Sequence, residues 1–184
     1  SNDNNVQIEF TGMDESEQRL QVYQDILGNS ANTIQGNILN TLPKLDKNSF
    51  DFAILGWASH EIESSQLEQV YTEINKALKP KGVLFIADFV SGLISEVESL
   101  SIQLIKKRRE NLMLDAESRE QEDWLKNINK YNTHNHSKEH HGKHKHHKQH
   151  YFVKEHFNFL NNAGFSTVEE IWRYMNSSMI IAIK

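Results

Sequence analysis

Three polar residues that could bind a ligand or transfer a proton lie just beyond short apolar segments. Asp14, His60 and Asp88 follow the segments VQIEFTGM, FDFAILG and VLFIA, respectively. A carboxylate at the end of a strand can accept hydrogen bonds from both hydroxyl groups of a ribose, and an imidazole can act as a general base. The alternative for Asp14 is an acid at the start of a helix, where it interacts favourably with the helix dipole.

A histidine-rich stretch is the second feature that could carry chemistry. Eight of the ten histidines fall within residues 134–150, together with four lysines and one glutamate. Imidazole binds zinc, nickel and copper, and His140, His144 and His147 are the candidate ligands. The chain has no cysteine, which excludes disulfides, thiolate metal sites and a thiol nucleophile. The stretch is either a metal site or a low-complexity insertion.

The composition limits the possible partners. The 184 residues carry a formal net charge of −5, and the basic residues of the histidine-rich stretch make the remainder more acidic still. Nucleic acid is therefore not the expected partner, because its phosphates require a basic face. No apolar run approaches the roughly 20 residues of a membrane span. We expect a single cytoplasmic domain over residues 1–184 that does not enter a membrane.

Strands and helices alternate in the predicted secondary structure, which indicates an α/β protein. Four strands are expected, at residues 6–13, 33–35, 50–56 and 83–87. The third is apolar apart from Asp51 near its start, and predicts a strand buried on both faces. Ser65 and Glu68 form an S-x-x-E capping box, which predicts the start of a helix before the fourth strand.

The C-terminal region is expected to contain a helix and two strands. Val153, Phe157 and Leu160 have helical spacing, and Gly164 is the expected end of that helix. Segments 167–174 and 179–183 then predict an antiparallel strand pair. Between the fourth strand and this region, residues 89–150 form a predicted insert that is helical and rich in histidine, and is a candidate lid.

Four short motifs resemble those of the class I S-adenosylmethionine-dependent methyltransferases. Residues 10–17 (FTGMDESE) are similar to the family's xxGxDxSxE, and residues 35–43 to its GD…LP loop. Residues 50–60 resemble FDxVxxxxxLHH, and residues 77–84 (ALKPKGVL) resemble LKPGGxL. The resemblance covers the chain from the family's second strand to its last. It implies a Rossmann-like, mostly parallel sheet with helices on both faces and an antiparallel C-terminal strand pair.

The resemblance assigns S-adenosylmethionine as cofactor and a role to several residues. Asp14 would bind the ribose, and Asn37 and Ile38 would contact the adenine, although the family usually has Asp where Asn37 stands. Gly56 and Trp57 would face the cofactor or the acceptor, and Trp57 is equally compatible with the core. Two further candidates are catalytic: His60 as a base, and Asp88 as a residue lining the acceptor pocket beneath the 89–150 insert.

The family's first strand and its glycine-rich cofactor loop have no counterpart in the sequence. The chain contains no GxG motif, and only five residues precede Val6. That strand lies between the second and fourth strands of the family's sheet, so its absence would leave two strands without their shared neighbour. We therefore expect this chain to be part of a longer methyltransferase, or another segment to fill the gap.

Three functions remain compatible with the sequence. The first is methyl transfer from S-adenosylmethionine to a small-molecule acceptor. The second is a non-catalytic methyltransferase-like binding module. The third is a metal-handling protein that uses the histidine-rich stretch.

Overall fold

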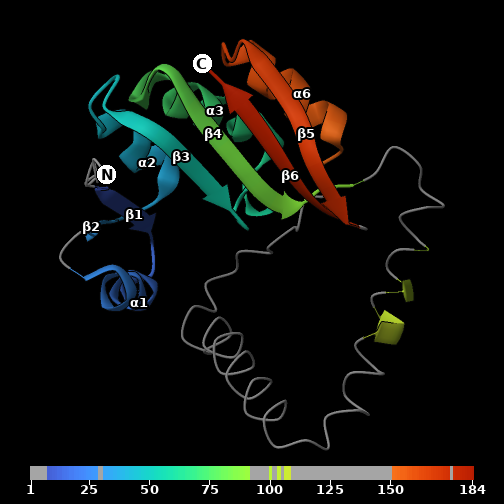
Figure 1. Cartoon of the computed structure of the whole chain (residues 1–184), viewed down its shortest axis with the longest axis horizontal. Helices are drawn as coiled ribbons and strands as arrows, with labels where there is room; N and C mark the ends of the chain where they lie inside the picture. The colour runs from blue at the N-terminus through green and yellow to red at the C-terminus, as the bar shows by residue number, and fades with distance from the viewer. Residues whose placement is uncertain are drawn as a thin grey trace, which may run out of the picture.

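The computed structural model describes residues 8–28, 31–91, 100, 103–104, 106–108, 151–174 and 176–184 (Figure 1). Its elements are β1 (Phe10–Asp14), α1 (Glu17–Leu27), β2 (Ala31–Gln35), α2 (Ile38–Thr41), the 3₁₀ helix η2 (Leu42–Lys44), β3 (Phe50–Gly56), the 3₁₀ helix η3 (Ser59–Glu61), α3 (Ser64–Ala77), β4 (Leu78–Phe89), α6 (Val153–Asn162), β5 (Thr167–Tyr174) and β6 (Ser177–Ile183). The predicted insert 89–150 lies almost entirely outside the described residues.

The strands form two separate sheets. β1 and β2 pair in parallel, with Asp14 opposite Gln35. The larger sheet has the order β3-β4-β6-β5, in which β3 and β4 are parallel and β6 is antiparallel to both of its neighbours. The structure thus confirms the α/β class, with parallel strands, helices and a C-terminal antiparallel pair.

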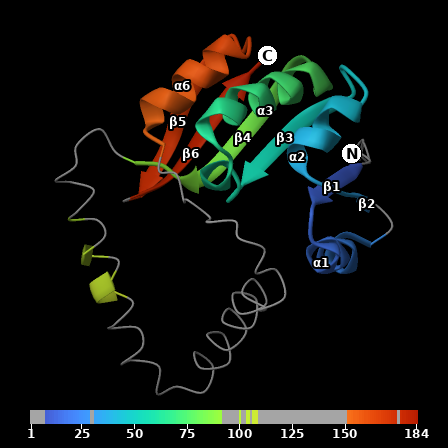
Figure 2. The ribbon, with the colours of Figure 1, turned by 180° about the vertical axis from the view of Figure 1, so that it is seen from behind.

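Helices α2, α3 and α6 lie on one face of the larger sheet, as the view from behind shows (Figure 2). The apolar residues of α3 recur every three or four positions, so one stripe of the helix is buried against the sheet. The fully buried side chains of this core include Leu67, Val70, Leu84, Leu160 and Ile180. Hydrophobic burial between these helices and the sheet therefore holds the strand ends in place.

The N-terminal end of α3 differs from the predicted capping box. The helix begins at Ser64 with Glu63 as its N-cap, and no side chain caps it. The Glu68 carboxylate instead accepts a hydrogen bond of 2.9 Å from the Asn162 side chain of α6. The reason for the difference is tertiary: Glu68 links two helices and is not free to turn back to its own N-terminus.

The predicted C-terminal helix and strands are confirmed. α6 ends at Asn162, and Gly164 has a φ of 91°, a left-handed conformation that glycine adopts without strain. The strand at 167–174 has the predicted bounds, whereas the last strand begins two residues earlier than predicted, at Ser177.

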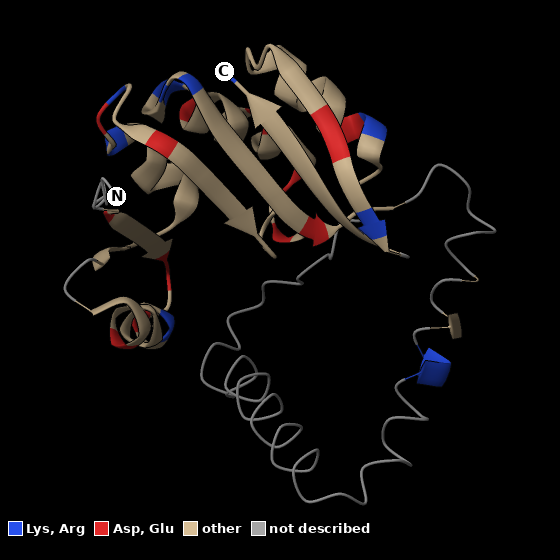
Figure 3. Ribbon diagram, in the orientation of Figure 1, with Lys and Arg blue, Asp and Glu red and all other residues tan. Residues whose placement is uncertain are grey.

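β3 is much more exposed than its sequence predicts. The Phe52 and Ile54 side chains are 63% and 78% exposed, so the prediction of a strand buried on both faces is wrong. The reason is that, within the described part of the chain, no helix covers the face of β3 opposite α3 and no strand pairs with its edge opposite β4. Figure 3 shows that β3, β4 and β6 carry few charged residues.

No helix of the described residues is both long enough and apolar enough to cross a membrane.

Candidate functional site

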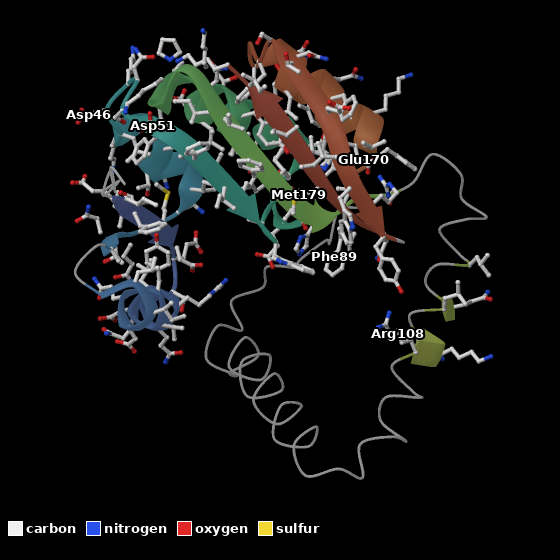
Figure 4. The ribbon with its side chains drawn as sticks, in the orientation of Figure 1. Asp46, Asp51, Phe89, Arg108, Glu170 and Met179 are labelled. Carbon is white, nitrogen blue, oxygen red and sulfur yellow. The ribbon has the colours of Figure 1, made fainter. Side chains whose placement is uncertain are left out.

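The carboxyl ends of β3 and β4 lie side by side and bring several predicted site residues together. Gly56 of β3 is opposite Ala87 of β4 in the register, so the residues that follow each strand are neighbours. Figure 4 labels Phe89 at this end of the sheet, whereas Asp51 lies at the other end of β3. Ligands of parallel sheets bind at the carboxyl ends of the strands.

Asp88 is a buried carboxylate whose two oxygens accept hydrogen bonds from five groups. Its Oδ2 atom accepts from the Ser59 amide at 2.7 Å, the Ser59 hydroxyl at 2.5 Å and the His60 amide at 3.3 Å. Its Oδ1 atom accepts from the Phe89 amide and from Nδ1 of His60, at 2.7 and 2.6 Å. The first turn of η3 therefore wraps around this carboxylate.

These contacts keep Asp88 ionised although it is buried. Burial alone would raise the pKa of its carboxyl group, but hydrogen bonds from His60 and Ser59, the charge of His60 and the Phe89 amide outweigh burial and hold the pKa below its ordinary value. An ionised carboxylate only accepts hydrogen bonds, so Nδ1 of His60 carries the proton. Asp88 is 2% exposed, which places it behind His60 and away from the surface where a ligand would bind.

His60 occupies the position between Asp88 and the strand edge. Its Nε2 atom is 3.9 Å from a carboxylate oxygen of Glu61, and its side chain keeps 10% of its surface exposed. The ring packs against Phe89, with ring centroids 5.7 Å apart. The arrangement is a carboxylate–imidazole pair, which can hold an imidazole in one tautomer and stabilise its protonated form.

Trp57 lies on the surface, so of the two positions that the sequence allows, the one in the core is wrong. It is 59% exposed and has a φ of 54°, an uncommon left-handed conformation for a residue with a side chain. Its amide donates to the Ala87 carbonyl at 2.8 Å, and its ring meets Phe89 edge-on at 4.7 Å. Trp57 and Phe89 thus form an aromatic wall next to His60.

The ends of β1 and β2 form a second group of predicted site residues. The Asp14 carboxylate accepts from the Ser16 amide at 2.8 Å and contacts Arg19 at 3.3 Å, so it also supports the start of α1. Its side chain is 27% exposed. Two carboxylate oxygens offer about four acceptor sites, so capacity for two ribose hydroxyl groups remains. The acceptor oxygens at this strand end fit the hydroxyl groups of a ribose.

Asn37 lies beside Asp14 through the pairing of β1 with β2. Its side-chain oxygen caps α2 by accepting from the Leu39 amide at 3.0 Å, and its side-chain nitrogen donates to Glu15 at 2.5 Å. Ile38, the first residue of α2, is half-buried against the core. Glu15 explains why an amide fits at position 37, because a second carboxylate at this distance would repel the first.

The two groups of residues lie on different sheets. Asp14, Asn37 and Ile38 belong to the β1–β2 pair, whereas Gly56, Trp57, His60 and Asp88 belong to the larger sheet. Among the strands that the structure describes, none pairs with both β1 and β3. The structure therefore places the residues predicted to bind adenosine and the potential base on separate edges.

Sequence analysis missed Ser59 and Phe89, which contact the predicted site residues, and the buried Tyr71 hydroxyl group, which is 2.7 Å from Nδ1 of His156. A serine next to the candidate histidine was the available signal for Ser59. Tyr71 belongs to the apolar stripe of α3, so its hydroxyl group gave no signal. Phe89 was not predicted as part of the site because β4 extends two residues beyond the end of the predicted strand.

The predicted metal ligands cannot be placed. His140, His144 and His147 lie outside the described residues, and the described part of the chain has no group of three His, Asp or Glu residues that could hold a metal ion. One described residue of the insert reaches the strand ends: Arg108 donates a hydrogen bond of 2.8 Å to the Tyr174 hydroxyl group (Figure 4).

Comparison with known proteins agrees with this geometry. Residues 2–86 match the family model described as a methyltransferase domain. No curated protein matches the chain. The chain is similar to an O-methyltransferase family protein from Burkholderia thailandensis, with a TM-score of 0.59 and 13% identity over 95% of this chain and 43% of that one.

Two further solved structures share the fold. PigF with SAH has a TM-score of 0.57 and 11% identity, covering 97% of this chain and 43% of that one. A SAM-dependent methyltransferase from Methanosarcina mazei has a TM-score of 0.56 and 16% identity, covering 95% and 81%. The chain thus spans less than half of the PigF and Burkholderia chains. Residues 2–86 are thus similar to a methyltransferase domain, and the chain shares the fold of these solved structures.

Proposed function

We propose that the protein transfers a methyl group from S-adenosylmethionine to a small-molecule acceptor that must lose a proton, and that His60 is the base. The observation that carries the proposal is the 2.6 Å contact between His60 Nδ1 and the buried Asp88 carboxylate at the carboxyl ends of β3 and β4. An acceptor without a proton to lose would need only positioning, and such a pair would then have no role.

The geometry assigns a separate task to each residue of the pair. Because Nδ1 of His60 carries a proton and donates it in a hydrogen bond to Asp88, Nε2 is the basic nitrogen of the ring. When Nε2 takes a proton from the acceptor, the ring becomes cationic, and Asp88 and Glu61 lie on its two sides to stabilise that charge. Asp88 therefore orients the base and does not contact the acceptor itself.

The cofactor supplies an electrophilic methyl group. Asp14 would hold its ribose, while Asn37 and Ile38 would contact its adenine. Gly56 would allow close approach at the end of β3, because a Cβ atom added there meets no neighbour within 4 Å. Trp57 and Phe89 would exclude water beside His60 and so strengthen its electrostatic interactions.

Binding of S-adenosylhomocysteine to the full chain, measured by calorimetry, tests the cofactor half of the proposal. We expect Asp14→Ala to weaken binding about tenfold or more, because it removes the acceptor of two hydroxyl hydrogen bonds. Asp51→Ala is the matched control, since Asp51 is an exposed strand aspartate at the opposite end of β3. Equal affinities of the Asp14→Ala protein and the wild type would contradict the ribose role.

Methyl transfer from labelled cofactor to a panel of phenols and other hydroxyl compounds tests the catalytic half. For any accepted compound, His60→Gln should lower kcat by a factor of about 100 or more, because the base is lost. The loss should shrink for compounds that are already ionised at the assay pH. A variant as active as the wild type on a neutral hydroxyl acceptor would rule out His60 as base.

A non-catalytic binding module is the second candidate. The separation of Asp14 and His60 onto two unpaired sheets favours it, because no described strand holds the two edges at a fixed distance. If the protein is such a module, it should bind an acceptor-like compound without the cofactor and should not transfer the labelled methyl group.

A further inference from the structure

Tyr151 joins the two chain segments that carry the proposed base and its carboxylate. One segment follows β3 and contains His60 in η3, and the other is the end of β4, which contains Asp88, with the residues after it. The Tyr151 hydroxyl group donates to the Ile62 carbonyl at 2.5 Å, two residues beyond His60. The Tyr151 carbonyl accepts from the Ser91 amide at 2.8 Å, three residues beyond Asp88. Tyr151 therefore connects the two segments close to the pair.

The short helix η3 is held from outside at both of its ends. At its start, the amides of Ser59 and His60 donate to Asp88, at 2.7 and 3.3 Å. At its end, Ile62 is the C-cap, whose amide donates to the Ser59 carbonyl and whose carbonyl accepts from Tyr151. A 3₁₀ helix of one turn has few hydrogen bonds of its own. These contacts with other segments therefore decide where His60 lies.

The Tyr151 side chain is itself fixed by the core. It is 3% exposed, and its ring meets the rings of His156 and Phe159 of α6 edge-on, with centroids 5.6 and 6.3 Å apart. Burial, and then the charges of Glu155 and Glu63, raise the pKa of its hydroxyl group to about 12. The group is therefore protonated at neutral pH and can donate. Packing against α6 thus places a hydrogen-bond donor at the end of η3.

The main chain next to Tyr151 is bound to the segment that follows β4. The Ser91 amide donates to the Tyr151 carbonyl, and the Val153 amide donates to the Ser91 carbonyl at 3.4 Å. Ser91 and Phe152 form an isolated parallel bridge, and Ser91 is 2% exposed. Tyr151 therefore keeps its place relative to β4, so its hydrogen bond to Ile62 fixes how far η3 lies from β4.

We infer that Tyr151 is a positioning residue for the His60–Asp88 pair: its hydrogen bond to Ile62 sets the position of η3 relative to β4 and thereby the contact between the two side chains. The inference rests on the proposed role of His60 as base. Without the Tyr151 hydroxyl group, the Ile62 carbonyl loses this donor in the core, and η3 shifts to find another. The 2.6 Å contact between His60 Nδ1 and Asp88 should then lengthen.

The test uses the proton between His60 Nδ1 and Asp88, observed by proton NMR on the full chain without cofactor or acceptor. A short, charge-assisted hydrogen bond places such a proton far downfield, and its loss in His60→Gln assigns it. Tyr151→Phe keeps the ring and removes the hydroxyl group, so we expect this resonance to move upfield as the contact lengthens. With an accepted substrate, kcat should fall about tenfold at unchanged KM, because the base is misplaced while the acceptor still binds.

Ile74→Val is the matched control for a loss of stability. Ile74 is 5% exposed and lies in the last turn of α3, where its carbonyl accepts from the amide of the first residue of β4, at the opposite end of that strand from Asp88. Removing one buried methyl group costs about as much stability as removing one hydrogen bond. The control should keep the wild-type resonance and kcat. An unchanged resonance or kcat in folded Tyr151→Phe, the same changes in Ile74→Val, or a wild-type spectrum without a proton assignable to His60 would overturn the inference.

A second substitution covers the case in which Tyr151→Phe does not fold. The amino acid p-aminophenylalanine at position 151 keeps a donor in the same place, but its N–H group is a weaker donor than the phenol. The resonance should therefore move upfield by less than in Tyr151→Phe, and an unmoved resonance would overturn the inference. Because the spectrum needs no turnover, a wild-type protein that shows the resonance and its response but methylates nothing would count against the proposed function alone.

Discussion

The ionised carboxylate of Asp88 is the residue on which the candidate site depends most. A buried charge costs several kcal/mol unless hydrogen bonds replace its hydration. Here five donors do so, three of them backbone amides that leave the carboxylate no alternative position. Removing the carboxylate would orphan these donors in the core, and removing a donor would leave the buried charge less well stabilised, so either change should destabilise the fold.

We predict that His156 makes the protein sensitive to mild acid. Its pKa is about 4 in the folded protein and 6.5 when unperturbed, so the unfolded chain binds more protons between these values. Stability is full above pH 6.5 and falls by up to about 3 kcal/mol as the pH approaches 4. Urea unfolding at pH 7, 6, 5 and 4 measures this loss.

His156→Gln is the variant that isolates this effect, because glutamine does not titrate. Its free energy of unfolding should change less between pH 6.5 and 4 than that of the wild type. The lowered pKa of Asp88 contributes at more acidic pH, since that contribution is lost only below the ordinary value of 3.8. If the free energy of unfolding changes equally with pH in the two proteins, His156 does not cause the pH dependence of stability.

At the scale of elements, the sequence correctly predicted those helices and strands whose bounds depend on interactions between neighbouring residues. The helix α6, its glycine end and the strand β5 follow from apolar spacing and from the backbone freedom of Gly164. The start of α3 was predicted wrongly because Glu68 is engaged by Asn162, a residue 94 positions away. A sequence motif cannot show that a distant element competes for a cap.

The candidate site was likewise predicted only in part from the sequence. Its strand-end residues Asp14, His60 and Asp88 could be named from their positions, because parallel strands place their carboxyl ends together. The burial of Asp88 behind Ser59 and His60, and that of the Tyr71 hydroxyl group in the core, depend on how the helices pack on the sheet. Tyr71 is indistinguishable in the sequence from the other residues of its apolar stripe.

We predict that Asn37→Asp destabilises the junction of β1, β2 and α2. Aspartate keeps the cap on α2 but places a second carboxylate next to Glu15, where the amide now donates at 2.5 Å. The site is exposed, so the cost should be at most about 1 kcal/mol and should decrease with salt. Thermal unfolding at low and high salt measures it.

Adding Glu15→Gln to Asn37→Asp provides the control. The double variant restores one charged and one neutral partner, so its stability should return toward that of the wild type. If the single and double variants are equally stable at low salt, repulsion from Glu15 does not explain the asparagine at this position.

At the scale of the whole molecule, the sheet is divided where a continuous one would be expected from the strand pattern. The pairs β1–β2 and β3–β4 both run parallel, yet the described strands leave one edge of β3 unpaired. Open edges and uncovered apolar faces promote association with other chains. The exposed side chains on this face of β3 are those of Phe52 and Ile54.

We predict that the double substitution Phe52→Thr and Ile54→Thr reduces self-association without unfolding the chain. Both side chains are more than 60% exposed, so little packing is lost, and threonine is compatible with a strand. Sedimentation of the two proteins at matched concentrations measures the effect. Leu55→Thr is the contrasting variant, since Leu55 is buried and its loss should unfold the chain. If the double variant associates as strongly as the wild type, a surface other than this face of β3 is responsible for self-association.

The unpaired edge of β3 also predicts how fast each backbone amide of this strand exchanges its hydrogen with the solvent. The Trp57 amide donates to Ala87 of β4, and successive amides of a parallel strand point to opposite sides. The amides of Ala53 and Leu55 should therefore face β4 and exchange with deuterium slowly, whereas those of Phe52, Ile54 and Gly56 should exchange quickly. A strand that joined this edge would slow the second set and leave the first unchanged. Alternating exchange along seven residues would thus report whether the sheet is open or closed.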